Sequence, residues 1–135
     1  MDLEQPITTK QVRILIVDDN EINRILLKKM LSKYPFQLGF CEDGQQAFDK
    51  LMDREFDIVL MDIHMPIMDG LETTKMLRGL PDPYFKQLPI IALTASTLAN
   101  DVEKIYRIGF NDYQSKPFKI EELIEKIARL IPTEQ

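Results

Sequence analysis

Short apolar runs alternate along the chain with longer stretches of helical spacing. The apolar runs are rich in Ile, Val and Leu and are too short for helices, so they predict β-strands. They cover residues 12–17, 36–41, about 57–61, 89–93 and, in a more polar form typical of a sheet edge, 111–115. The helical stretches cover about 21–33, 45–54, 71–80, 98–107 and 121–131. Five strands alternating with five helices predict an α/β fold, a doubly wound parallel sheet covered by helices on both faces.

One domain accounts for the predicted pattern. Residues 12–131 carry all of its strands and helices, so residues 1–11 are expected to form a flexible lead-in and residues 132–135 a short tail. A chain of 135 residues leaves no room for a second domain of ordinary size. The stretch 81–87 contains two prolines, which interrupt the third helix and predict a longer connection before the fourth strand.

Composition narrows the functional classes. The formal net charge of −5 disfavours nucleic acid as a partner, because nucleic-acid binding needs a basic surface. No apolar run approaches the roughly 20 residues of a membrane-spanning helix, and the N-terminus lacks a signal-peptide pattern. We therefore expect a cytoplasmic domain without membrane contact. Cys41 is the single cysteine and is expected to be a small buried hydrophobe.

Polar residues follow four of the predicted strands. Asp18 and Asp19 come after the first strand, Asp62 after the central run 58–61, Thr94 after the fourth strand and Lys116 after the fifth. The carboxyl ends of parallel strands meet at one edge of a sheet, where ligands bind in open α/β folds. We therefore expect these side chains to form one site. Each residue alone also has an ordinary interpretation, such as a helix cap for Asp18 or Asp19.

The chemistry of this set favours phosphoryl transfer. Three carboxylates that share a partly desolvated cleft cannot all stay ionised without a cation. Oxygen ligands without His or Cys favour a hard ion, and Mg²⁺ is the natural choice because it binds through one or two carboxylates, water and phosphate oxygens. A lysine ammonium and a threonine hydroxyl are donors that suit the other oxygens of a phosphoryl group. Asp62 is therefore a candidate nucleophile that forms an aspartyl phosphate.

Four motifs in the chain resemble the receiver domain of response regulators in two-component signalling. They are VDDN at 17–20, LMDIHMPIMDG at 60–70, ALTA at 92–95 and YQSKPF at 113–118, in the order and spacing of that family. The resemblance covers about residues 12–131. It implies a flavodoxin-like receiver fold with the strand order 2-1-3-4-5.

The resemblance also implies the residues of a metal and phosphoryl site. Asp62 matches the phosphoacceptor, and Asp19 matches a direct Mg²⁺ ligand. Asp18 matches the second acid of the pair, which often acts through water, and the backbone carbonyl of His64 matches the third protein ligand. The implied protein is a signalling receiver that promotes its own phosphorylation and dephosphorylation, with no substrate turnover.

A second group of matching residues implies a conformational switch. Lys116 matches the lysine that pairs with the phosphoryl group, Thr94 the hydroxyl residue that moves toward it, and Tyr113 the aromatic residue that changes rotamer with Thr94. Taken alone, Tyr113 is equally well explained as a packed edge aromatic with a solvated hydroxyl. We expect a cis peptide bond between Lys116 and Pro117, because the lysine must turn back over the cleft and only an X-Pro bond makes that isomer accessible.

Two other classes of protein remain to be weighed. A phosphatase of the haloacid dehalogenase kind also forms an aspartyl phosphate, but it needs a second Asp two residues after the nucleophile, where this chain has His64. A flavodoxin-like nucleotide carrier needs a phosphate-binding loop after the first strand, where Asp18 and Asp19 would repel phosphate in the absence of a metal. The chain also contains no Gly-x-Gly-x-x-Gly or Walker-type motif.

The first predicted helix carries more apolar surface than packing on the sheet requires. At about 100° per residue, Ile22 and Ile25 fall outside the stripe that is expected to face the sheet. That stripe consists of Asn23, Leu27, Met30 and Leu31. Exposed apolar residues beside a site often mark a docking surface, so Ile22 and Ile25 are candidates for partner docking. The alternative is that they are scattered surface residues, which are common.

The stretch 18–24 resembles receivers attached to hybrid sensor kinases. This resemblance implies a sensor histidine kinase as phosphoryl donor and a histidine phosphotransfer protein as acceptor, in a relay without transcriptional output. The alternative is a stand-alone single-domain response regulator that acts by protein–protein binding.

Overall fold

A five-stranded parallel sheet forms the centre of the computed structural model, which describes residues 11–131. Its strands are β1 (Val12–Val17), β2 (Phe36–Cys41), β3 (Ile58–Asp62), β4 (Ile90–Thr94) and β5 (Asp112–Ser115). They lie in the order β2-β1-β3-β4-β5, as the resemblance implied, with the polar strand β5 at an edge. The expected tail 132–135, and all of the expected lead-in except Gln11, lie outside the described residues.

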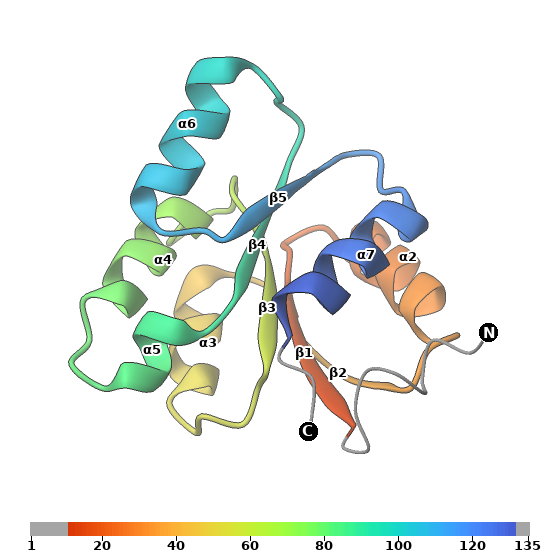
Figure 1. Ribbon diagram of the computed structural model, residues 1–135, viewed down its shortest axis with the longest axis horizontal. Helices are drawn as coiled ribbons and strands as arrows, with labels where there is room; N and C mark the ends of the chain where they lie inside the picture. Colours follow the sequence, from red (N-terminus) through yellow and green to blue (C-terminus); the bar gives the residue numbers. More distant parts are fainter. Residues whose placement is uncertain (1–10, 132–135) are drawn as a thin grey trace.

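Helices cover both faces of the sheet (Figure 1). They are α2 (Glu21–Leu31), α3 (Gly44–Leu51), α4 (Gly70–Arg78), α5 (Pro83–Gln87), α6 (Ala99–Ile108) and α7 (Ile120–Leu130). The prediction of five helices was therefore wrong for residues 11–131, which contain six. The five predicted helices are all present, with ends that differ from the predicted ones by a few residues.

The additional helix, α5, lies within the stretch that was predicted to be a connection. Asp82 caps this helix, since its carboxylate accepts a hydrogen bond from the Tyr84 backbone N–H at 2.9 Å. Pro83 occupies the first turn, where the missing N–H of proline costs nothing. Phe85 anchors the helix in the core, where it is almost completely buried. The sequence analysis took both prolines of this stretch as helix breakers, although Pro83 begins a helix.

The two faces of the sheet have separate hydrophobic cores. Alternate residues of a strand point to opposite faces, so Ile14 and Ile16 of β1 pack with α2 and α7, whereas Leu15 and Val17 pack with α3, α4, α5 and α6. Figure 1 shows the same division, with α2 and α7 on one side of the sheet and the other four helices on the opposite side. The central strands are therefore buried on both faces, which explains their continuous apolar sequences.

Several local predictions are confirmed. The Lys116–Pro117 peptide bond is cis. Cys41 is a free, buried cysteine, and burial raises the pKa of its thiol to about 11. Between residues 11 and 131, none of the helices combines the length and the apolar character that crossing a bilayer requires.

Candidate functional site

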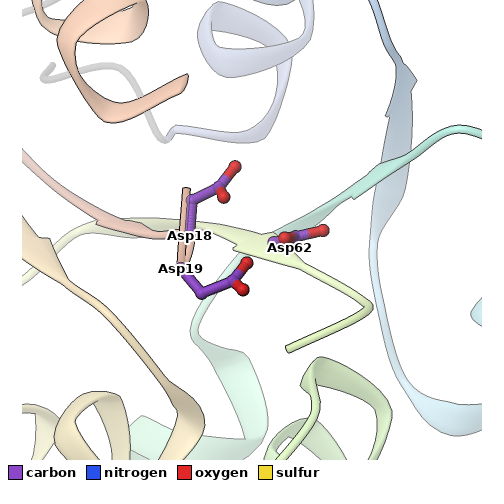
Figure 2. A group of neighbouring side chains, drawn as sticks. All are labelled: Asp18, Asp19 and Asp62. Atoms are coloured by element: carbon purple, nitrogen blue, oxygen red, sulfur yellow. The ribbon is translucent and has the colours of Figure 1, made fainter. Parts of the chain in front are cut away.

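The register of the central strands brings the predicted acids together. Val17 of β1 pairs with Met61 of β3, so the next residues along the two strands, Asp18 and Asp62, lie side by side. Figure 2 shows Asp18 and Asp19 at the end of β1 and Asp62 at the end of β3. Carboxylate oxygens of all three residues lie within 4.8 Å of one another. The strand order, which makes β1 and β3 neighbours, is what creates this cluster.

Lys116 is a cationic side chain in contact with the cluster. Its Nζ lies 3.1 Å from Oδ1 of Asp62 and 3.7 Å from Oδ2 of Asp18. Lys116 follows β5, whose last residue Ser115 pairs with Thr94 of β4. The ammonium therefore reaches across the end of β4 to the acids on β1 and β3. This contact confirms that the residues after the first, third and fifth strands form one cluster.

The environment of Asp62 disfavours its charged form. The residue is only 4% exposed. Loss of solvation and the nearby charge of Asp18 raise its pKa from the ordinary value of 3.8 to about 6. The Lys116 ammonium and a hydrogen bond from the His64 backbone oppose this rise in pKa. Repulsion within the acid cluster therefore exceeds what one lysine compensates.

The acid pair is not simply the cap of α2. The N-cap is Asn20, whose side-chain oxygen accepts a hydrogen bond from the Asn23 backbone N–H at 3.1 Å. Asp18 is fully buried and accepts a hydrogen bond from the Asn20 backbone N–H at 2.9 Å. Asp19 is exposed, and its carboxylate is free of the capping role. The structure therefore excludes helix capping as the explanation for Asp18 and Asp19.

The backbone behind Asp62 is held by the start of α4. The Gly70 backbone N–H donates to the Ile63 carbonyl at 2.8 Å. A Cβ atom at Gly70 would lie 2.3 Å from the carbonyl oxygen of Asp62, so only glycine permits this close approach. Asp69 caps α4 by accepting a hydrogen bond from the Glu72 backbone N–H at 2.8 Å. The Asp69-Gly70 pair thereby fixes the end of β3.

Thr94 lies beside a cavity at the end of β4. Its hydroxyl oxygen accepts a hydrogen bond from the Ser96 backbone N–H at 3.1 Å and donates to the Ser96 carbonyl at 3.3 Å. Thr94, Ser96 and His64 line the cavity, which has a volume of about 220 Å³. The His64 side chain is exposed. Thr94 therefore belongs to the same end of the sheet as the acids, with its hydroxyl bound to its own loop.

Tyr113 is separate from the acid cluster in this structure. It lies on β5 opposite Ala92 and is partly buried. Its ring packs edge-on against Tyr106, with ring centroids 6.3 Å apart, and the Lys126 ammonium lies 5.2 Å from its ring centroid. These contacts place its aromatic ring between α6 and α7.

The outer face of α2 is apolar next to the site. Ile22 is 74% exposed and Ile25 is 53% exposed, as the helical spacing predicted. Leu26 extends the same exposed surface.

The sequence analysis missed contacts made by Asn23, Arg24 and Ser96. Asn23 donates a side-chain hydrogen bond to Asp18, and Arg24 donates one to the Asp18 carbonyl. A signal for Asn23 was present, because it is the one polar residue on the stripe of α2 that was expected to face the sheet. The sequence carries no comparable signal for Arg24 or Ser96, since both contacts go to backbone atoms.

The donor atoms of the cluster suit a hard divalent cation. All three side chains supply carboxylate oxygens, and they are close enough for one ion to contact them or their bound waters. The raised pKa of Asp62 reflects uncompensated negative charge, which a bound cation would offset. The residues present therefore fit a Mg²⁺ site.

Comparisons with known proteins agree with this geometry. Residues 14–128 match the family model of the response regulator receiver domain. The chain is 37% identical over 138 aligned positions to hybrid signal transduction histidine kinase G of Dictyostelium discoideum, a match that covers 98% of this chain and 4% of that kinase. The chain therefore spans only a small part of the length of this relative.

Two solved structures are similar in both sequence and fold. The receiver domain of a sensor histidine kinase from Pseudomonas aeruginosa PAO1, with a magnesium ion coordinated in its active-site cleft, is 35% identical with a TM-score of 0.78, and the match covers 89% of this chain and 96% of that one. The receiver domain of a Saccharomyces cerevisiae response regulator, solved with its histidine phosphotransfer protein, is 30% identical with a TM-score of 0.80, covering 89% and 88% of the two chains.

The raised pKa of Asp62 predicts a pH-dependent effect of its removal. In the folded protein the pKa is about 6, above the ordinary 3.8, so the stabilisation from binding this proton is present below about pH 4 and lost as the pH rises through 6. In metal-free buffer, Asp62→Asn should therefore stabilise the protein relative to wild type more at pH 8 than at pH 4, by up to about 3 kcal/mol. Urea denaturation in EDTA at both pH values measures this difference.

The control for this measurement is Asp53→Asn, which removes one charge from an exposed turn residue. It should shift the free energy of unfolding by similar small amounts at pH 4 and pH 8. An Asp62→Asn effect that is the same at both pH values would show that Asp62 is not held near neutrality by the cluster.

Proposed function

The chain belongs to the response regulator receiver family, and from that membership we propose that it accepts a phosphoryl group from phosphohistidine onto Asp62 in a two-component phosphorelay. Receiver domains of this family are signalling modules. The observation that carries the proposal is the position of Asp62, which lies almost completely buried at the end of β3 with Asp18 on one side and the Lys116 ammonium at 3.1 Å.

A Mg²⁺ ion is the cofactor that we propose for this reaction. Asp19 would bind it directly, Asp18 would bind it through water, and Asp62 and the His64 backbone carbonyl would complete the protein ligands. The oxygen-only cluster supports this assignment, as does the magnesium ion in the Pseudomonas aeruginosa receiver. When bound, the ion would neutralise charge shared between the carboxylates and the phosphoryl oxygens.

The side chains of the site have complementary roles in the proposed transfer. A carboxylate oxygen of Asp62 attacks phosphorus, the P–N bond of the phosphohistidine breaks, and the imidazole leaves with the electron pair of that bond. Lys116 already contacts Asp62 and is able to pair with a phosphoryl oxygen once the carboxylate is esterified. Thr94 would donate its hydroxyl to another phosphoryl oxygen after it leaves Ser96.

Phosphorylation should depend on both Mg²⁺ and Asp62. With acetyl phosphate as a small donor and Mg²⁺ present, wild type should retain the mass of one phosphoryl group, as should Asp53→Asn, whose carboxylate lies in an exposed turn. Asp62→Asn should not gain it, because the amide is a poor nucleophile, and EDTA should prevent the gain in wild type. Intact-mass spectrometry measures all four samples.

Two outcomes of this experiment would contradict the proposal. An Asp62→Asn variant that gains one phosphoryl group at the wild-type rate would remove Asp62 as the acceptor. Continuous release of phosphate without a retained mass increment would instead favour a phosphatase.

We further propose that Thr94 and Tyr113 form a switch that responds to phosphorylation. The hydroxyl of Thr94 is held by Ser96 beside a cavity of about 220 Å³, so there is room for the side chain and its loop to move. Tyr113 lies on the neighbouring strand and packs against Tyr106 of α6. Movement of Thr94 toward the phosphoryl group would let Tyr113 pack behind it, which would change the surface formed by α6, β5 and α7.

The switch predicts a change in backbone protection on that side of the domain. Wild type with Mg²⁺ and beryllium fluoride, which imitates an aspartyl phosphate, should show altered amide hydrogen exchange over residues 94–115. The Asp62→Asn variant under the same conditions is the control and should show no change. Identical exchange in wild type with and without the mimic would place the switch elsewhere or exclude it.

The proposed relay passes the phosphoryl group from a sensor histidine kinase to a histidine phosphotransfer protein. The match to a hybrid kinase and the complex of a similar yeast receiver with its phosphotransfer protein support this choice of partners. The exposed apolar side chains of Ile22 and Ile25 lie on α2, which begins three residues after Asp18. We propose that they form part of the docking surface for the phosphotransfer protein.

Polar substitutions on α2 should slow the relay and leave phosphorylation by acetyl phosphate intact. The double variant Ile22→Ser/Ile25→Ser should transfer its phosphoryl group to a panel of histidine phosphotransfer proteins more slowly than wild type, by about tenfold or more if docking loses roughly 1.4 kcal/mol. The matched control is Met76→Ser, which removes an apolar side chain that is 41% exposed on α4.

Transfer is followed by the loss of label from the phosphorylated domain. A double variant that transfers as fast as wild type would contradict docking through Ile22 and Ile25. A panel in which no member accepts the group would contradict the relay itself, and the retained phosphoryl group on Asp62 would still support the receiver assignment.

A further inference from the structure

Asp18 is a buried carboxylate whose two oxygens are both held by protein donors. Its Oδ1 accepts a hydrogen bond from the Asn20 backbone N–H at 2.9 Å, and its Oδ2 accepts one from Nδ2 of Asn23 at 3.3 Å. Lys116 Nζ lies 3.7 Å from the same Oδ2. Since Asp18 is fully buried, these donors and not bulk solvent fix the orientation of its carboxylate.

The backbone of Asp18 is held by the next residue of α2. Nη1 of Arg24 donates to the Asp18 carbonyl oxygen at 2.7 Å, and the Asp18 N–H donates to the Cys41 carbonyl at 3.1 Å. Nη2 of Arg24 lies 3.9 Å from Glu42 Oε2, so its charge has a partner outside the acid cluster. Two consecutive residues of α2 therefore hold the side chain and the main chain of Asp18.

We propose that Asn23 and Arg24 are positioning residues that set the affinity of the acid cluster for a divalent cation. The inference rests on the proposed function, which places Mg²⁺ at this cluster. Carboxylates at metal sites need hydrogen-bond partners that fix their orientation, and loss of such a partner typically weakens metal binding by about 10- to 100-fold.

The chemical types of the two residues suit this task. Asn23 is a neutral donor, so it orients Asp18 without cancelling the negative charge that attracts the cation. A lysine at that position would compete with the cation for Asp18. Arg24 is charged, but its donor goes to the backbone carbonyl and leaves the carboxylate to Asn20, Asn23 and Lys116. The pair therefore restrains Asp18 and keeps its charge for the ion.

Mg²⁺ affinity is the property that tests this proposal. Isothermal titration calorimetry on wild type, Asn23→Leu and Arg24→Met should give a Kd for Mg²⁺ that is roughly tenfold or more higher in each variant. Lys29→Ala, an exposed substitution on the same helix, should keep the wild-type Kd. Melting temperatures in EDTA, measured in parallel, separate any loss of stability from a loss of affinity.

The dependence of the phosphorylation rate on Mg²⁺ provides a second measurement. With acetyl phosphate, the half-saturating Mg²⁺ concentration of Asn23→Leu should rise by the same factor as its Kd, and its rate at saturating Mg²⁺ should stay within about twofold of wild type. A residue with a merely structural role would lower the melting temperature and leave the half-saturating concentration unchanged. Should Asn23→Leu fail to fold, Asn23→Ala, which adds no bulk, decides by the same criteria.

The outcomes separate this inference from the proposed function. Folded variants whose Kd equals that of wild type would overturn the positioning role and leave the cation site intact. Wild type that binds no Mg²⁺ in calorimetry would overturn the cation site itself.

Discussion

The mutual repulsion of Asp18, Asp19 and Asp62 is the constraint on which the rest of the site depends. Two ionised carboxylates about 5 Å apart repel by roughly 3 kcal/mol at an effective dielectric constant of about 20. The Lys116 ammonium lies closer to Asp62 than this, at 3.1 Å, and offsets part of the repulsion. One ammonium still leaves two negative charges of the cluster uncompensated, which agrees with the raised pKa of Asp62. A divalent cation carries the charge that this arrangement lacks.

Helix α2 meets two requirements of the site with opposite faces. Inward, Asn23 and Arg24 hold Asp18, while Leu27 packs in the core against the sheet. Outward, Ile22 and Ile25 expose apolar surface within a few residues of the acids. Residues 22–25 alternate between these faces because successive helical positions are about 100° apart. A partner that docks on the outer face would therefore contact the same turn that orients the acid pair.

The sequence predicted the strands and the acid cluster because apolar runs determine a parallel sheet and its ends. Asp18, Asp62 and Lys116 were recognisable as residues that directly follow such runs. The helix α5 was missed because proline is compatible with both a break and a first turn, and the burial of Phe85 decided between them. The bond from Arg24 to the Asp18 carbonyl was not predictable, since any nearby donor can satisfy a carbonyl and the choice depends on the folded geometry.

The energies of the contacts around Thr94 and Tyr113 explain how one phosphoryl group could operate both. The two hydrogen bonds between Thr94 and Ser96 stabilise the present loop by about 1 kcal/mol each. The contact of Lys126 with the Tyr113 ring contributes about another 0.5–1 kcal/mol. A hydrogen bond from Thr94 to a charged phosphoryl oxygen is worth about 1.5–3 kcal/mol, which is close to what these contacts supply. Because the two arrangements are nearly balanced, modification at Asp62 needs to contribute only one strong hydrogen bond to shift the population.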